Sequence, residues 1–544
     1  MELISQHAKK IMEGCKERAR DMGLRFQDES LEYIVTNRDL IELSPKNMIP
    51  TLYDYWVQDV EVLREKGRYE LYPSNPYETV INTRPAISFY NDNNPDWLNV
   101  MIFYHVIGHI DFFQNNLFFR HTWDYDFASR ALSDKRMIAK LRSEKGRWVD
   151  YIIEFSRAID NLVSFHKELA RFTGPEKDRK INRLDYYFDI FLQEVKKVSI
   201  TSYVKEIERY NTLLKENPQD AERNFIESVQ IQYAEFESLF EKQNTSKRSQ
   251  KNYDIFQFLM ENSPFLKKDE NKWMLMVMEA VRSTSLYFQP QIRTKILNEG
   301  WASYWHEQLF LHDDRISGHE IEFAIVNAKV TSMPRVGLNP YALGMRLFSY
   351  IEDLSDKGRL SRAFRYLKDK ESRKRFDDKS CTGREYIFLV RENFSDSMFV
   401  NTFIDQDFVD MHKLFVTGKR LNKERMTWQY YVQSRDAEKY KKMVLDSLYH
   451  PPSIEISVTE DNSLLLNHLF EEKPLVKEYI TGTLLGVEYL WGSQVFLDTS
   501  EAQLRNAKVV DQTPPTEEKP EQEIIWKRVR YRMKDRVLSR KDIG

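Results

Sequence analysis

Hydrophobic side chains in the region 1–425 recur mostly at intervals of three and four positions, which is the spacing of one face of an α-helix. Long segments with this period fill the region from about Trp148 to Phe288. A further helix is expected to begin near Gln289, because Pro290 ends the helix before it, and to continue through IRTKILNEGWASYWHEQLFLH. The pattern therefore predicts a large, mainly helical domain.

One segment of this region has no polar face. Residues 96–113, DWLNVMIFYHVIGHIDFF, are apolar on nearly every side of a helix, and they follow the turn-forming sequence NDNNP. A surface helix would keep one face polar, so this helix is predicted to lie inside the core.

The pattern changes after position 425. Strand-like stretches at 428–434, 453–458, 463–470 and 494–499 alternate with helical stretches at 437–449 and 474–490. This order predicts a ferredoxin-like βαββαβ domain. Residues 501–544 include TPPTEEKPEQE and the run WKRVRYRMKDRVLSRK, which are typical of a polar, basic tail. The predicted fold class is α+β, with a helical domain at 1–425, a βαββαβ domain at 426–500 and a tail at 501–544.

Composition narrows the class of protein. A formal net charge of −3 over 544 residues gives no field that would attract nucleic acid, so nucleic-acid binding is not expected. Cys15 and Cys381 are far apart, which argues against a disulfide framework and against a thiolate zinc cluster. No apolar stretch approaches the roughly 18 residues of a membrane span, and the N-terminus lacks the apolar core of a signal peptide. A cytoplasmic protein is expected.

His105 and His109 are the first candidates for chemistry. They stand four positions apart in YHVIGHIDFF, so a helix places both imidazoles on one face, within reach of one metal ion. A buried imidazole needs a hydrogen-bond partner or a ligand to offset desolvation, and a shared metal would serve both rings. The alternative is a pair of core histidines satisfied by backbone carbonyls or by Asp111.

The segment LNEGWASYWHE supplies a carboxylate, Glu299. It is similar to the LNEGFA-type segment of gluzincin aminopeptidases, whose glutamate is the third zinc ligand after two histidines on a neighbouring helix. The resemblance implies a zincin-like helix pair on which His105, His109 and Glu299 hold zinc. In zinc peptidases a strand before the histidine helix pairs with an extended peptide, and the stretch from Pro85 to Tyr90 is expected to be such an edge strand.

The chain departs from the gluzincin pattern in two ways. Val106 occupies the position at which an HExxH motif carries its general base. Glu299 also lies far beyond His109 in the sequence, so the helices predicted between them must form a large insertion.

A hydrolase would therefore need a base from another position. His306, Glu307 and Asp111 are the carboxylate and imidazole groups closest in sequence to the ligands. His306 lies two helical turns after the glutamate ligand, so it is also a candidate for a fourth ligand or for a group that supports one. His312 and His319 are expected in a solvated loop, LHDDRISGHE.

Several longer strings resemble the SpoVR (stage V sporulation protein R) family. They are YETVINTRPAISF, HVIGHIDFFQNN, QIRTKILNEGWASYWH, GLNPYALGMRLF, REYIFLVRENFSDSMFV and the HPP before SIEISV, in family order from about residue 5 to 500. The resemblance implies a bacterial or archaeal cytosolic protein acting in sporulation, the cell envelope or stress signalling. It also implies partnership with a PrkA-type serine kinase and a second co-encoded protein. It supplies no established activity.

Two functions are compatible with these observations. In the first, the protein is a metal-dependent hydrolase of a peptide, amide or peptidoglycan-related substrate, with zinc held by His105, His109 and Glu299. In the second, it is a noncatalytic regulatory protein in which any metal only ties two helices together and the C-terminal domain and tail bind a partner. Val106 favours the second.

Overall fold

A computed structural model describes six stretches of the chain, in two compact units formed by residues 1–163 with 259–544 and by residues 164–258. The described residues are 2–27, 30–36, 78–163, 183–241, 254–506 and 522–543, without 84, 120–121, 123–126, 197, 199, 218–219, 362–363, 365–366, 368, 423–426 and 472.

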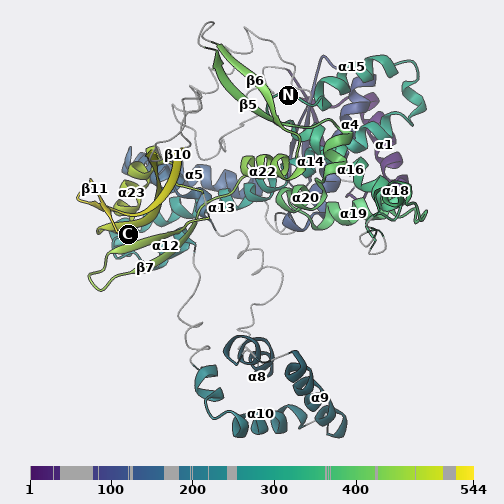
Figure 1. Cartoon of the computed structure of the whole chain (residues 1–544). Coiled ribbons are helices and arrows are strands. Elements are labelled where there is room, and N and C mark those ends of the chain that lie inside the picture. The colour runs from purple at the N-terminus through teal and green to yellow at the C-terminus, as the bar shows by residue number, and fades with distance from the viewer. Residues whose placement is uncertain are drawn as a thin grey trace, which may run out of the picture. The chain divides into compact units, whose positions relative to one another are not determined.

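The smaller unit is helical in its described part. Its helices pack around buried aromatic side chains, among them Tyr187, Phe191, Phe225 and Phe236. Three of the helices are labelled in Figure 1. The elements are α8 (Arg183–Asp185), the π-helix η3 (Tyr186–Val195), α9 (Ile200–Glu216) and α10 (Ala221–Gln232).

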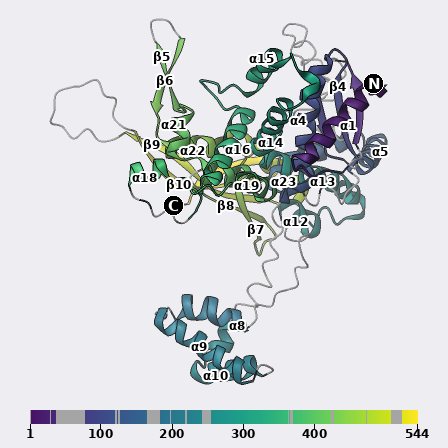
Figure 2. The same ribbon diagram turned by 90° about the vertical axis from the view of Figure 1, so that its right-hand side faces the viewer.

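In the larger unit, α4 (Asp96–Asn115), α14 (Lys295–Phe310) and α16 (Pro340–Asp356) lie side by side, with α14 in contact with both of the others (Figure 1 and Figure 2). Every residue of α4 from Leu98 to Phe113 is buried, which confirms the prediction of a core helix.

Further helices complete this unit. They are α1 (Gln6–Asp21), α5 (Phe127–Lys145), α6 (Trp148–Arg157), α13 (Lys272–Arg293), α15 (Glu320–Thr331), α18 (Lys370–Arg375), α19 (Gly383–Asn393), α20 (Asp396–Phe403), α21 (Gln406–Met411), α22 (Ala437–Ser447) and α23 (Lys477–Trp491). Helix α12 (Ile255–Asn262) includes the last residues of the smaller unit and the first of the resumed larger one.

Glycine allows the three central helices to approach at backbone distance. A Cβ atom on Gly108 of α4 would lie 2.8 Å from the Cα of Ala302 in α14. On the opposite side of α14, a Cβ on Gly300 would lie 2.4 Å from the Cα of Gly344 in α16. Real Cβ atoms do not approach so closely, so these positions require glycine. The contacts fix the separation of α14 from both neighbours.

The predicted start of α14 near Gln289 is wrong. Helix α13 continues through Pro290 to Arg293, and α14 begins two residues later, at Lys295. A proline removes only one backbone donor, and Tyr287, Gln289 and Pro290 itself are buried, so packing retains the helix.

A residue from far along the chain caps α14. The carboxylate of Asp396 accepts hydrogen bonds from the N–H groups of Ile296 and Leu297, each 2.9 Å long. A negative charge at a helix N-terminus is also favoured by the helix dipole. Burial nevertheless raises the pKa of Asp396 to about 7. The cap fixes where the helix begins, and therefore which face Glu299 occupies.

The N-terminal sheet has the order β1-β2-β4-β3. Strand β4 runs parallel to β2 and antiparallel to β3, so it is an interior strand. The prediction that residues 85–90 form an edge strand, open to a peptide, is therefore wrong. The strands are β1 (Glu2–Leu3), β2 (Ser30–Val35), β3 (Glu78–Ile81) and β4 (Ala86–Asn91).

The C-terminal sheet has five strands in the order β11-β10-β9-β8-β7. Strands β8 and β9 are parallel and are connected through α23, and the other neighbours are antiparallel. The strands are β7 (Ser453–Val458), β8 (Leu464–Leu469), β9 (Val495–Asn506), β10 (Gln522–Lys534) and β11 (Val537–Asp542).

This sheet corrects two predictions. Strand β6 (Thr427–Ser434) pairs in a separate hairpin with β5 (Val416–Asn422), so the predicted βαββαβ elements do not share one ferredoxin-like sheet. The basic run expected in a tail forms β10 and β11. Its buried Val529, Tyr531 and Met533 alternate with arginines, which is the period of a half-buried strand and was hidden by the high charge.

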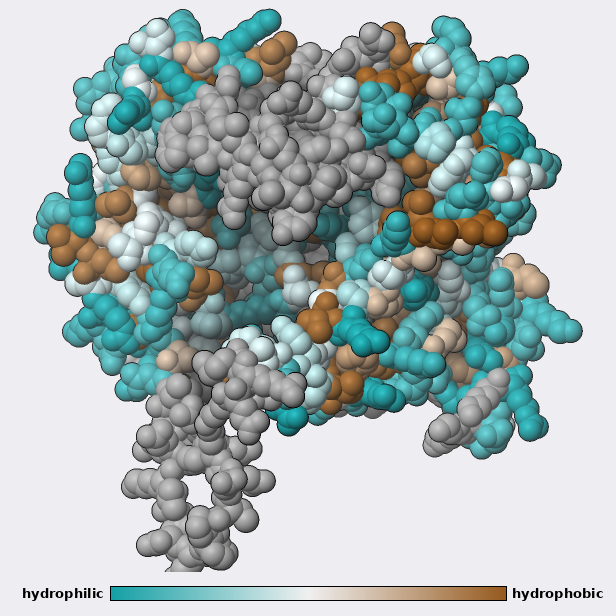
Figure 3. All heavy atoms as spheres, turned by 90° about the horizontal axis from the view of Figure 1, so that it is seen from above, coloured by the Kyte–Doolittle hydropathy of each residue, from teal (hydrophilic) through white to brown (hydrophobic). Residues whose placement is uncertain are grey.

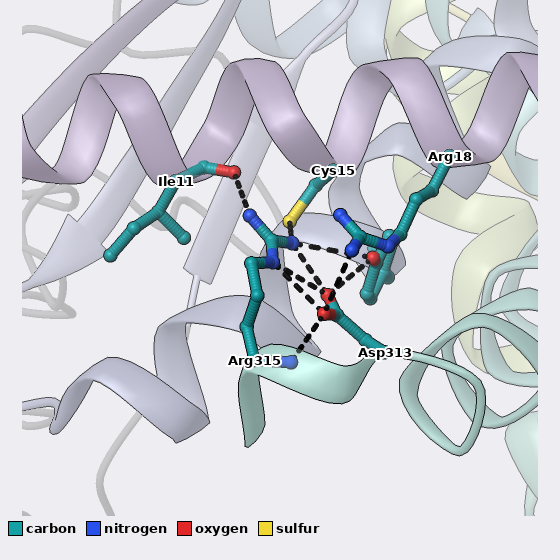
Figure 4. Close-up of polar contacts among 6 residues, drawn as sticks. Ile11, Cys15, Arg18, Asp313 and Arg315 are labelled. Carbon is teal, nitrogen blue, oxygen red and sulfur yellow. Dashed lines mark hydrogen bonds and ion pairs between the residues drawn. The ribbon is translucent and has the colours of Figure 1, made fainter. Parts of the chain in front are cut away.

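A polar cluster joins α1 to the segment after α14 (Figure 4). Arg315 pairs with Asp313 and donates a hydrogen bond from Nη2 to the sulfur of Cys15, at 3.1 Å. The hydroxyl of Tyr104 in α4 donates to Asp313, at 2.7 Å. Tyr104 immediately precedes the first histidine, so the cluster connects α1 to the helix that carries both imidazoles.

In the described ranges, no helix has the length and apolarity that a membrane crossing requires. On the face shown in Figure 3, hydrophobic residues form separate patches among hydrophilic ones.

The glycine contacts predict the outcome of adding a single methyl group. Gly300→Ala should lower the free energy of unfolding by about 1–3 kcal/mol, because the new Cβ would overlap the backbone of α16. Gly482→Ala in α23 is the control, since a Cβ there meets no atom within 4 Å and should stabilise the helix by about 0.5–1 kcal/mol. Urea denaturation of both variants measures the difference. Equal effects would contradict the backbone contact.

The two cysteines should differ in reactivity. Burial raises the pKa of the Cys15 thiol to about 11, so it is neutral at pH 7 and inaccessible, whereas Cys381 is exposed. We expect a thiol reagent such as DTNB to titrate one thiol per chain in the native protein and two in denaturant. Rapid labelling of Cys15 in the Cys381→Ser variant would show that α1 is not seated as described.

Candidate metal centre

Helix α4 places His105 and His109 one turn apart on the face that meets α14. Their side chains are buried, with residue exposures of 5% and 7%. The ring centroids are 4.6 Å apart and the ring planes are nearly perpendicular, at 88°. The i, i+4 spacing seen in the sequence therefore becomes a pair of adjacent imidazoles.

Helix α14 brings Glu299 to this pair, although the two helices lie far apart in the sequence. Oε2 of Glu299 lies 3.5 Å from Nε2 of His109 and 3.9 Å from Nε2 of His105. These distances are too long for hydrogen bonds. They are close to the ~3.3 Å between neighbouring ligand atoms that bond lengths of about 2.0–2.1 Å give around tetrahedral zinc.

The surroundings of the glutamate are suited to a cation. Its Oε2 atom is buried and has no hydrogen-bond partner among the described residues. Burial raises the pKa of Glu299, and His109 and a hydrogen bond from Tyr341 oppose this shift. Tyr341 comes from the first turn of α16 and also stacks on His105, with centroids 6.0 Å apart. A buried oxygen without a donor, facing two imidazoles, is what a metal ion would satisfy.

The donor set fits a particular class of metal ion. Two imidazole nitrogens and a carboxylate suit zinc and other first-row transition ions. In the described part of the chain, no other group of three such side chains converges in this way.

The Nδ1 atoms of the two histidines also have hydrogen-bond partners. Nδ1 of His109 lies 2.9 Å from Oδ1 of Asn298, and Nδ1 of His105 lies 2.9 Å from Nδ1 of His306. Burial lowers the pKa of His105 well below its usual range, and the neighbouring imidazoles add to the effect. A neutral imidazole is the form that binds a metal.

His306 lies behind His105 and is fully buried. Its Nε2 lies 3.0 Å from Oδ1 of Asn327 in α15, so both of its ring nitrogens are engaged. Burial lowers the pKa of His306 to about 4. His306 is therefore hydrogen-bonded to His105, a candidate ligand, and is not directed at Glu299.

Asp111 and Glu307 lie apart from the three ligand candidates. Asp111 accepts a hydrogen bond from Nε1 of Trp301, at 2.8 Å, and pairs with the buried Arg391, at 3.4 Å. Burial raises the pKa of Asp111 to about 6. Glu307 accepts from Nδ2 of Asn327, at 2.8 Å. Neither carboxylate is hydrogen-bonded to the histidine pair, so Asp111 does not satisfy the core histidines.

His312 and His319 lie outside the centre. His312 is exposed, as predicted, and its ring contacts the carbonyl of Gln308. His319 is partly buried and stacks on Trp97, with centroids 5.9 Å apart, so the solvated-loop prediction is wrong for it.

Three contributors were not anticipated from the sequence: Asn298, Asn327 and Tyr341. Asn298 directly precedes the glutamate and faces His109, a position that the LNEG string offered. Asn327 and Tyr341 come from other helices, and no spacing rule connects them to the histidines. A buried histidine with no local partner was the available signal that such residues must exist.

Comparison with known proteins places the chain in a family. The family described as "SpoVR like protein" matches residues 2–450, which include all three ligand candidates. The chain is 21% identical over 508 residues to "Uncharacterized protein YcgB" of Escherichia coli (strain K12), with 89% of each protein covered. No solved structure matches the chain. Because the match spans most of its length, the protein belongs to the SpoVR family.

Proposed function

We propose that the protein binds one zinc ion through His105, His109 and Glu299 and that this centre hydrolyses a peptide or amide bond. The observation that carries the proposal is the buried Oε2 atom of Glu299, which faces two imidazole nitrogens at 3.5 and 3.9 Å without a hydrogen-bond donor. An unpaired carboxylate oxygen in this position is costly unless a cation occupies the space.

The ligand set favours a catalytic role over a structural one. Structural zinc sites are closed by four protein ligands that are mostly cysteines, whereas catalytic sites use three ligands such as two histidines and a glutamate. Both cysteines of this chain lie outside the group of three. A fourth position would then remain for a water molecule or a substrate.

The residues have separate tasks in this proposal. The two histidines and the glutamate hold the ion, and the Tyr341 hydroxyl donates a hydrogen bond to Glu299. A zinc ion lowers the pKa of a bound water to about 7 and polarises a carbonyl group. A base for that water would have to come from a position other than 106, where this chain has valine.

A second candidate function is noncatalytic. Val106 is fully buried, and Asp111, Glu307 and His306 are engaged in contacts of their own, which favours a protein whose metal only ties α4 to α14. In that case the protein would act as a regulatory partner of the PrkA-type kinase and co-encoded protein that the family resemblance implies.

Elemental analysis of the purified protein tests the metal site. We expect about one zinc per chain in the wild type and loss of that zinc in the His105→Ala, His109→Ala double variant. The His7→Ala, His450→Ala double variant is the control, because it removes two exposed histidines that pair with Asp96 and Glu471. Equal metal content in both double variants, or none in the wild type, would refute the site.

Activity then separates the two candidate functions. The zinc-loaded protein should release amines from a mixture of peptides and peptidoglycan fragments, and Glu299→Gln should abolish both the zinc and the release. Stoichiometric zinc with no turnover of either substrate class would support the regulatory function.

A further inference from the structure

A chain of three hydrogen bonds leads away from the proposed centre. Nδ1 of His105 meets Nδ1 of His306 at 2.9 Å, Nε2 of His306 meets Oδ1 of Asn327 at 3.0 Å, and Nδ2 of Asn327 meets Oε2 of Glu307 at 2.8 Å. The last residue lines a pocket of about 610 Å³ against α15. The chain therefore runs from buried imidazole to the pocket wall.

The carboxylate of Glu307 fixes which atom donates and which accepts in each of these hydrogen bonds. An ionised Glu307 can only accept, so the Asn327 amide must turn its NH₂ group toward it and its carbonyl oxygen toward His306. That oxygen also only accepts, so the proton of neutral His306 must lie on Nε2. Its Nδ1 is then an acceptor, and His105 must carry its proton on Nδ1.

We infer that Glu307, acting through Asn327 and His306, holds His105 in the tautomer protonated at Nδ1. In this tautomer the lone pair of Nε2 points toward Glu299, which lies 3.9 Å away. The inference rests on the proposed metal site for its consequence, since a protonated Nε2 cannot bind an ion. Glu307 is thus a positioning residue, not a base.

Replacing Glu307 by glutamine tests the direction of the hydrogen bonds, because the two side chains have nearly the same shape. A glutamine can donate as well as accept, so the Asn327 amide can reverse, and each proton along the chain can move to the opposite nitrogen. A reversed chain leaves His105 protonated at Nε2. Adding Asn327→Asp restores the direction, because a carboxylate at position 327 only accepts from His306.

The experiment combines ¹⁵N NMR of histidine-labelled, metal-free protein with Co²⁺ and Zn²⁺ titrations. In the wild type we expect His105 to be protonated at Nδ1. In Glu307→Gln we expect mixed tautomers of His105 and about 10- to 100-fold weaker metal binding. The Glu307→Gln, Asn327→Asp double variant should recover both the wild-type tautomer and the wild-type metal affinity. Glu322→Gln, an exposed position on α15, removes the same charge and should change neither.

The outcomes are distinguishable. A wild-type His105 protonated at Nε2, or a Glu307→Gln variant with unchanged tautomer, would overturn the inference. Weaker metal binding in Glu307→Gln that the double variant does not restore would also overturn it, because the cause would then be packing. A wild type that binds neither ion but shows the expected tautomers would refute the metal site and leave the positioning role of Glu307 intact.

Discussion

The close approach of α14 to its two neighbours is the constraint on which the centre depends. At Gly300 and Gly344 the backbones of α14 and α16 touch, and at Gly108 and Ala302 those of α4 and α14 do. Backbones in contact cannot slide or turn without collision. Side chains on the facing surfaces are therefore held at set distances, although the two ligand helices come from distant parts of the sequence.

Polar groups are concentrated in this tightly packed region, where their desolvation is most costly. Most of them are satisfied in pairs: Asp396 with the first turn of α14, Asp111 with Trp301 and Arg391, and His306 with Asn327. Some buried polar atoms of this region have no hydrogen-bond partner, among them Ser303 Oγ, Trp305 Nε1 and Oε2 of Glu299. The Glu299 oxygen differs because it is part of a carboxylate and lies 3.5 and 3.9 Å from two imidazole nitrogens, which is where the proposed ion would be bound.

The sequence predicted the parts of this arrangement that depend on local period or on a short string. The apolar run around His105 predicted a core helix, the i, i+4 spacing predicted one shared face, and the LNEG string indicated Glu299. Features set by tertiary contact were not predictable. Asp396 caps a helix from a distant segment of the chain, and Tyr341 reaches the centre from a third helix. In β10 the arginines between buried residues give the segment the high charge that is typical of a solvated tail.

The Gly108–Ala302 contact also bears on competition among ions in a cell, where magnesium is far more abundant than zinc. The contact sets the distance between the two histidines on α4 and the glutamate on α14. Two of the three candidate ligand atoms are nitrogen. Calcium needs six to eight oxygen ligands at about 2.3–2.6 Å, and magnesium retains its water shell and prefers oxygen. Two imidazoles and one carboxylate do not provide that number of oxygens. At the proposed centre, one missing methyl group on α4 would thus contribute to selecting a scarce ion over a plentiful one.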